Sequence, residues 1–240
     1  MQQDDRKAFI FWKACPCVPP ELTEVKMEYS EAYFKSRNPH REAAFHHRLI
    51  RVLAPLIRPG GRCLDMGAGT GYLTEQLLQD GSREVVAVDM SEYAVQQLKA
   101  RCPTAEVVHG DIESSLAING VFDTITLIHV LEHTQSPREV LSRVKGWLAP
   151  SGVAVIVVPN CGPCWQRWLG DRQWGHGDPS HVSFFTRQSL RALMTSVFEE
   201  TRFFTYPVPG LWMLSPCLAR ILAFGLGTHL VAVGLNKPEP

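Results

Sequence analysis

Three glycines and a preceding acid mark the part of the sequence best suited to bind a ligand. The run Leu64-Asp-Met-Gly-Ala-Gly-Thr-Gly71 leads from an apolar stretch into an amphipathic one. Glycine lets the backbone turn tightly and approach a ligand without a Cβ in the way. The helix expected next offers unpaired backbone N–H groups to an acidic part of a ligand. Asp65 would repel a phosphate but suits an ammonium group.

Two further acids end the apolar runs that follow. Asp89 lies eighteen residues after Gly71 and is placed to accept hydrogen bonds from ribose hydroxyls. Asp111 could accept an adenine amino group, and the alternative is that it only closes a turn. Tyr72 stands where a dinucleotide fingerprint carries its third glycine, which disfavours a pyrophosphate ligand. Tight packing between strand and helix is the alternative explanation for the glycines.

Histidines gather in two later stretches. His129 and His133 belong to His-Val-Leu-Glu-His, and His176 and His181 belong to a stretch rich in Gly, Pro and Trp. Imidazole can take a proton from an acceptor group at neutral pH. His181 is the first candidate for an active-site histidine, and the alternative is that it only orders its loop.

Short apolar runs and longer amphipathic stretches alternate along the chain. Such alternation is typical of βαβ units and of a parallel sheet with helices on both faces. Strands are expected at 62–66, 84–89, 105–110, 122–129, 152–159, 200–206 and 229–236. Helices are expected at 28–56, 71–80, 91–101, 137–148 and, with Thr186 as cap, 186–197.

Together these motifs resemble the class I methyltransferases that use S-adenosylmethionine, in the branch of ubiquinone-pathway O-methyltransferases. The resemblance covers about residues 40–236 and rests on LDMGAGTG, AVDMS, HGDIE, FDTITLIHVLEHT and LAPSGVAVIVVPN, in this order. It implies an α/β fold, with a Rossmann-like, doubly wound, mostly parallel seven-stranded sheet, an antiparallel final strand and an N-terminal helical cap.

The expected organisation is an irregular arm at 1–27 followed by one methyltransferase domain at 28–240. Within that domain we expect a helical cap (28–58), a cofactor-binding sheet (62–159), a lid loop (160–182) and a helix and strand pair with an apolar insert (183–240).

The resemblance also implies roles for individual residues. The glycine loop would line the methionine and ribose part of S-adenosylmethionine, Asp65 would face the methionine amine, and Tyr33 would close over the cofactor. The predicted cofactor-binding residues are Tyr33, Asp65, Gly67, Ala68, Gly69, Gly71, Asp89, Met90, Asp111, Ile112 and His129. The predicted catalytic residues are His181 and His129.

No metal is expected, although two sets of residues leave alternatives. Ubiquinone-pathway O-methyltransferases, which the chain resembles at Glu132-His133, hold a divalent ion there with acids and a histidine. In this chain His129 replaces the first of those acids. Cys161-Gly-Pro-Cys164 has the spacing of a redox motif and, together with Cys15 and Cys17, could bind zinc.

The composition of the chain limits which binding partners and which cell compartment we expect. Lys plus Arg and Asp plus Glu number 24 each, so a neutral chain is expected to take a small-molecule substrate rather than nucleic acid. Seven scattered cysteines and an N-terminus without a basic start and apolar run predict a cytoplasmic protein with reduced thiols.

Arg220 and prolines interrupt the apolar stretch 203–236, so no membrane span is expected. For segment 210–227, the alternatives are a wall for a greasy acceptor, a peripheral membrane contact and a homodimer face.

The sequence therefore predicts transfer of a methyl group from S-adenosylmethionine to a small-molecule acceptor. O-methylation of a lipid or quinone-like compound, a sugar or another metabolite is favoured. The alternatives are a non-catalytic S-adenosylmethionine-binding protein that acts through a partner and a NAD-dependent oxidoreductase.

Overall fold

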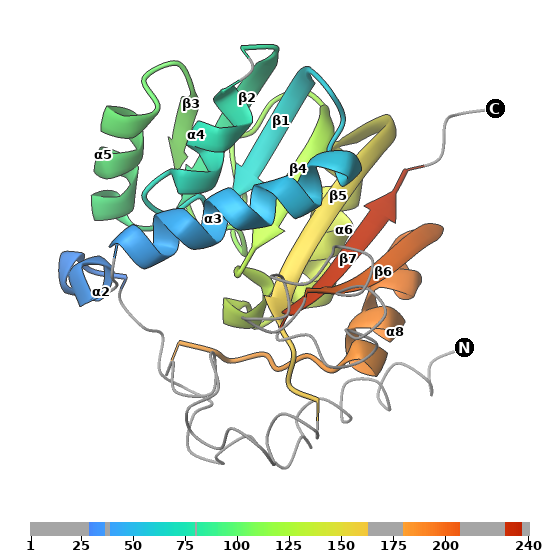
Figure 1. The fold of residues 1–240 in the computed structure, drawn as a ribbon. Coiled ribbons are helices and arrows are strands. Elements are labelled where there is room, and N and C mark those ends of the chain that lie inside the picture. The colour runs from blue at the N-terminus through green and yellow to red at the C-terminus, as the bar shows by residue number, and fades with distance from the viewer. Residues whose placement is uncertain (1–28, 37–38, 80, 163–179, 207–228, 237–240) are drawn as a thin grey trace.

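A seven-stranded sheet in the order β3-β2-β1-β4-β5-β7-β6 forms the centre of the molecule (Figure 1). The computed structural model describes residues 29–36, 39–79, 81–162, 180–206 and 229–236. Its strands are β1 (Gly61–Met66), β2 (Arg83–Asp89), β3 (Glu106–His109), β4 (Phe122–Ile128), β5 (Leu148–Pro159), β6 (Glu200–Tyr206) and β7 (His229–Leu235). Strands β1 to β5 pair in parallel, whereas β7 is antiparallel to both of its neighbours. The predicted mostly parallel sheet with an antiparallel final strand is confirmed.

Helices cover both faces of the sheet, and Figure 1 shows α3 crossing in front of the strands and α6 behind them. Leu49, Leu53 and Leu73 pack on one face, and Val140 and Met194 pack on the other. The helices are α2 (Glu31–Ser36), α3 (Pro39–Leu53), α4 (Tyr72–Leu78), α5 (Glu92–Arg101), α6 (Pro137–Trp147) and α8 (Arg187–Val197), with 3-10 turns η1 (Ala54–Leu56) and η2 (Leu131–His133). Strands covered on both faces explain the continuous apolar runs seen in the sequence.

Several predicted boundaries were wrong. The expected helix over 28–56 corresponds to two helices, α2 and α3, and α3 begins at Pro39, because proline suits the first turn of a helix. Strand β4 ends at Ile128 rather than His129, whose φ of 56° lies in the left-handed region. Strand β5 begins at Leu148, and its register against β4 shifts between Phe122 and Thr124.

The start of α8 follows the sequence closely. The Thr186 side chain accepts a hydrogen bond from the Ser189 backbone N–H and forms a capping box with it, so the predicted cap is confirmed. None of the helices in the described ranges is long and apolar enough to cross a membrane. Predictions on Cys15, Cys17, Cys164, His176 and segment 210–227 lie outside the described residues, as does most of the predicted lid loop.

Candidate active site

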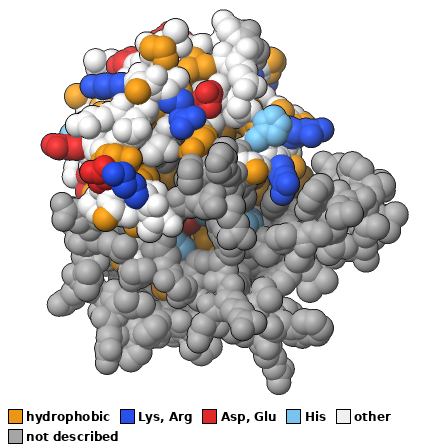
Figure 2. Space-filling view, turned by 60° about the vertical axis from the view of Figure 1, so that its left-hand side comes forward, with side chains coloured by type: hydrophobic (Ala, Val, Ile, Leu, Met, Phe, Trp, Pro, Cys, Tyr) orange, Lys and Arg blue, Asp and Glu red, His pale blue; other side chains and the backbone are white. Residues whose placement is uncertain are grey.

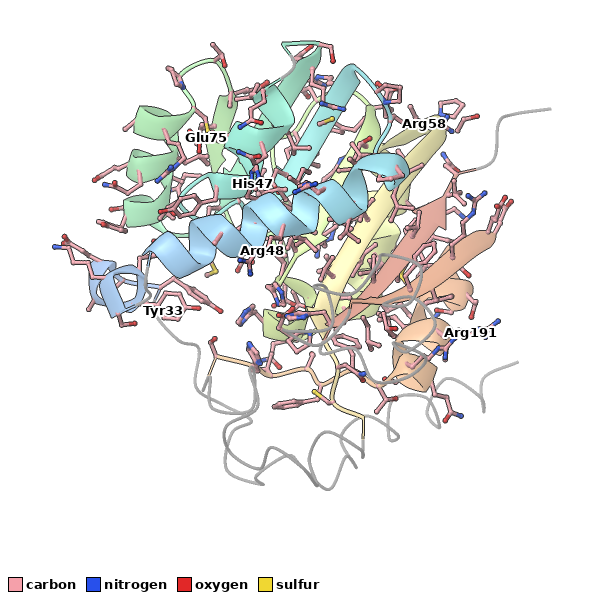
Figure 3. All side chains as sticks on the ribbon, in the orientation of Figure 1. Tyr33, His47, Arg48, Arg58, Glu75 and Arg191 are labelled. Carbon is pink, nitrogen blue, oxygen red and sulfur yellow. The ribbon has the colours of Figure 1, made fainter. Side chains whose placement is uncertain are left out.

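The predicted site residues meet at the carboxyl edge of the parallel strands. The glycine loop follows β1, Asp89 ends β2, Asp111 follows β3 and His129 follows β4. The strand order reverses between β1 and β4, which is where open α/β sheets bind their ligands. Figure 3 shows Tyr33 extending from α2 at this edge, while Arg58 lies at the opposite, amino edge.

The glycine loop combines tight packing with one open position. Gly67, Gly69 and Gly71 have φ values of 69°, 56° and 90°. A Cβ on Gly67 would collide with the Val130 side chain, and one on Gly71 would lie 2.6 Å from Leu98 Cδ1. A Cβ on Gly69 would meet nothing closer than Phe34 Cε1, at 3.9 Å. The loop therefore has room for a ligand at Gly69.

Asp65 lies under this loop and is 1% exposed. Its two oxygens accept hydrogen bonds from Thr74 Oγ1 at 2.7 Å and Thr126 Oγ1 at 2.9 Å. Burial raises the pKa of the Asp65 carboxyl to about 6, although both hydroxyl donors act in the opposite direction. Asp65 thus connects β1 to α4 and β4.

Asp89 connects the loop to the second strand. Its Oδ2 accepts a hydrogen bond from Gly69 N at 2.7 Å, and its Oδ1 accepts one from Ser91 N at 2.9 Å. Burial raises the pKa of Asp89, and these backbone donors lower it. Ala68 N also donates to Val88 O at 2.9 Å. Met90, the next residue after β2, is 37% exposed.

The remaining predicted cofactor residues, Asp111, Ile112 and Tyr33, differ in what they contact. Asp111 Oδ1 accepts a hydrogen bond from Glu113 N at 2.8 Å, as the turn-closing alternative requires. Ile112 is half-buried and packs against the main core. Tyr33 is half-buried, and its ring contacts those of Tyr29 and Phe34 edge-on.

Four histidines and a glutamate gather beside the end of β4. His129 Nδ1 lies 2.9 Å from Glu132 Oε1, and the Glu132 side chain is 2% exposed. The His229 ring lies 4.9 Å from that of His129, and burial lowers the pKa of His229 well below its usual range. The rings of His133 and His181 are 4.7 Å apart. The structure thus brings together both predicted catalytic histidines with Glu132 and His229.

Backbone hydrogen bonds hold the segment that carries His181 against the turn that carries His133. Val182 N and Ser183 N both donate to Glu132 O at 2.9 Å, and Ser183 Oγ donates to Thr134 O at 2.6 Å. His133 Nδ1 lies 3.1 Å from Ser180 O. The described part of the predicted lid loop after residue 179 is therefore firmly joined to the end of β4.

Sequence reasoning missed how Glu132 and His229 contribute. The sequence leaves Glu132 either as a metal ligand or as a residue that packs and caps a turn, although its position three residues after His129 also indicates a contact across the turn. His229 lies a hundred residues after His129, and no local pattern links the two.

The side chains of Glu132, His133 and His181 also lie close enough together to hold a metal ion. Each offers one ligand atom, and these atoms all lie within 4.8 Å of one another. A carboxylate and two imidazoles suit a borderline divalent ion such as zinc. Glu132 also contacts His129, whose Nδ1 lies 2.9 Å from Glu132 Oε1. Chelation tests the expectation that no metal is used.

The described thiols are poorly suited to redox chemistry. Cys63, Cys102 and Cys161 are buried, and burial raises the pKa of each to about 11. A thiol that stays protonated at neutral pH is a poor nucleophile. This weakens the redox hypothesis for Cys161 and Cys164.

Comparisons with known proteins agree with this geometry. The family model of a methyltransferase domain matches residues 37–197. The mitochondrial ubiquinone biosynthesis O-methyltransferase of Schizosaccharomyces pombe is 33% identical over 104 residues, 40% of this chain and 37% of that protein. The tRNA U34 carboxymethyltransferase of Methylococcus capsulatus is 36% identical over 115 residues, 45% of this chain and 35% of that protein. The matched stretch thus spans little more than a third of each of these relatives.

Solved structures share the fold at low sequence identity. A methyltransferase from Archaeoglobus fulgidus that depends on S-adenosylmethionine superposes with a TM-score of 0.67 and 18% identity, covering 86% of this chain and 100% of that one. The plantazolicin methyltransferase, solved with a pentazolic desmethylPZN analogue and SAH, superposes with a TM-score of 0.61 and 16% identity, covering 86% of this chain and 88% of that one. The family match excludes the oxidoreductase alternative, and the chain belongs to the S-adenosylmethionine-dependent methyltransferases.

Proposed function

We propose that the protein transfers a methyl group from S-adenosylmethionine to an oxygen of a small-molecule acceptor, such as a lipid or quinone-like compound, a sugar or another metabolite. The observation that carries this proposal is the bond between His129 and the buried Glu132, at the strand end next to the glycine loop. When bound, S-adenosylmethionine supplies an electrophilic methyl group, and an acceptor hydroxyl must lose its proton as it reacts.

On the donor side, each of the three acids binds a different part of the cofactor. Asp89 holds the ribose hydroxyls, because it ends β2 and is bonded to Gly69, where the loop has room for a ligand. Asp65 faces the methionine amine, and Asp111 with Ile112 holds the adenine. Met90 and Tyr33 cover the adenosine from either side.

On the acceptor side, His129 acts as the general base. Glu132 accepts a hydrogen bond from His129 Nδ1–H, which makes Nε2 the nitrogen that takes the acceptor proton. The buried carboxylate then stabilises the imidazolium that forms. His181, held beside His133, orients the acceptor. The rest of the rate enhancement comes from positioning the two reactants and from excluding water.

The surface charge favours a small acceptor over a polyanion. Arg62 pairs with Glu84 at 2.9 Å, and Arg101 pairs with Glu75 at 3.3 Å. Figure 2 shows basic and acidic side chains close together over much of the described part of one face, with histidine and basic groups gathered at one side. The transfer RNA enzyme among the relatives makes RNA the acceptor class to test in parallel.

A transfer assay with radiolabelled donor tests the proposal. Phenols, carboxylates, sugars, amines and transfer RNA are offered as acceptors, with Asp89→Ala as the blank. Label is expected in a hydroxyl-bearing small molecule and is expected to be absent with the variant. Transfer only to amines or to RNA would refute the acceptor class. Tight S-adenosylmethionine binding without transfer to any acceptor would support the non-catalytic alternative.

A further inference from the structure

Tyr29 lies just before α2 and contacts both sides of the candidate site. Its backbone carbonyl accepts a hydrogen bond from Ser91 Oγ at 2.6 Å. Its ring meets the His133 ring edge-on, with centroids 5.8 Å apart and planes at 88°. No motif of the sequence singles out this residue.

The Ser91 contact connects Tyr29 to the cofactor side. Ser91 is the N-cap of α5, is 5% exposed, and donates its backbone N–H to Asp89 Oδ1 at 2.9 Å. The other oxygen of Asp89 accepts the Gly69 N–H. Only one side chain therefore separates the Tyr29 backbone from the carboxylate proposed to hold the ribose.

A row of aromatic rings makes a second connection. Tyr29 contacts Tyr33 at 5.1 Å, Tyr33 contacts Phe34 at 5.2 Å, and Phe34 contacts Tyr93 of α5 at 5.7 Å between centroids. These separations are those of favourable ring pairs. Phe34 is also the nearest side chain to the open position at Gly69. A cofactor at Gly69 would therefore touch Phe34 within this row, and His133 contacts the Tyr29 end of it.

On the acceptor side, the Tyr29 ring completes the surroundings of His133. Hydrogen bonding to Ser180 holds His133 Nδ1, and the His181 ring lies 4.7 Å away. The edge of Tyr29 packs against the same imidazole. A change in the position of Tyr29 must therefore alter the packing of the histidine pair.

We propose that Tyr29 is a positioning residue that sets His133 and His181 for the acceptor when the cofactor binds. The inference rests on the proposed function, in which Asp89 binds the donor and these histidines face the acceptor. A bound donor fixes Ser91 and Phe34, these fix Tyr29, and its ring holds His133. Because coupling between two sites is reciprocal, a bound acceptor also tightens the donor.

Histidine ring resonances of the full chain test this coupling without any acceptor. Protein with ¹⁵N-labelled histidine is titrated with S-adenosylhomocysteine at fixed pH, and the signals are assigned with His133→Gln and His181→Gln. The ligand is expected to shift both signals in the wild type and in Tyr29→Phe, which keeps the ring. In Tyr29→Ala, which lacks the ring that contacts His133, both shifts are expected to be largely lost, while the Kd for the ligand changes less than about threefold.

Two results would overturn the inference. One is binding of the ligand to the wild type with no movement of either histidine signal. The other is a shift of equal size in Tyr29→Ala, which would mean that the ligand touches the histidines directly. If Tyr29→Ala does not fold, Ser91→Ala replaces it, because that variant keeps the ring and removes its anchor. A negative acceptor screen would count against the proposed function but leave these shifts unaffected.

Discussion

At the residue scale, the two acids at the ends of β1 and β2 are buried in different ways. Asp65 is bonded only to side-chain hydroxyls in the described contacts, and burial raises the pKa of its carboxyl to about 6. Asp89 receives backbone N–H groups from the loop and from α5. Asp65 therefore links side chains of α4 and β4, whereas Asp89 is held by backbone N–H groups of the loop and of the start of α5.

Asp65 is expected to make cofactor affinity depend on pH. Only the ionised carboxylate can pair with the methionine amine, and the pKa of about 6 means that it becomes protonated as the pH falls below that value. The affinity for S-adenosylhomocysteine should be constant above pH 7 and weaken by up to about tenfold per pH unit below 6. Calorimetry from pH 5 to 8 measures this slope. Asp65→Asn should bind weakly at pH 8 and lose the slope, and a slope that persists in the variant would belong to another group.

Glu132 is expected to matter for turnover rather than for donor binding. Glu132→Gln keeps an oxygen for His129 but removes the charge that supports an imidazolium, so kcat should fall by about a hundredfold. The Kd for S-adenosylhomocysteine should change less than about threefold. Glu139→Gln, on the exposed first turn of α6, is the matched control and should leave kcat unchanged.

The same assay separates a base from a metal ligand. If His129 and Glu132 act as described, exhaustive chelation leaves the wild-type rate unchanged. Loss of the rate on chelation and its recovery with zinc would instead assign Glu132, His133 and His181 to a cation.

At the element scale, two glycines of the glycine loop are needed for different reasons: Gly67 for folding and Gly69 for ligand binding. Gly67→Ala forces a side chain into Val130 in left-handed backbone, so its free energy of unfolding should fall by about 2 kcal/mol or more. Gly69→Ala has left-handed backbone without the collision and should lose about 1 kcal/mol. Its Cβ projects into the open position, so its Kd for S-adenosylhomocysteine should rise about tenfold. Urea unfolding and calorimetry on both variants measure the contrast, and equal losses of stability would contradict it.

The sequence predicted elements well where one pattern decides the structure. The apolar runs of β1, β2 and β4 have no competing interpretation, and Thr186 marked the start of α8 correctly. Boundaries failed where a single residue decides where an element starts or ends, as at Pro39, which begins α3, and at His129 with its positive φ. Neither change interrupts the hydrophobic period on which the prediction rested.

At the scale of the whole molecule, the sequence could place only those candidate site residues that lie at the carboxyl ends of parallel strands, because these ends meet at one edge of the sheet. The topology places Asp65, Asp89 and His129 at one edge, as their positions at the ends of parallel strands predict, while their roles there stay predictions. Tyr29 and His229 reach this edge through tertiary packing, from before α2 and from the start of the antiparallel β7. Local patterns do not encode such contacts, and these two residues were therefore missed.

Ligand-linked stability tests the whole donor site at once. A ligand at a hundred times its Kd adds about 2.7 kcal/mol to the free energy of unfolding. For a chain of 240 residues this should raise Tm by roughly 5 to 10 °C. Calorimetric scans should show that rise with S-adenosylhomocysteine and none with NAD, because Tyr72 replaces the glycine that a pyrophosphate needs. Asp89→Ala should unfold at the same temperature with and without S-adenosylhomocysteine. A full rise in that variant would remove Asp89 from the donor site, since its carboxylate would then contribute nothing to binding.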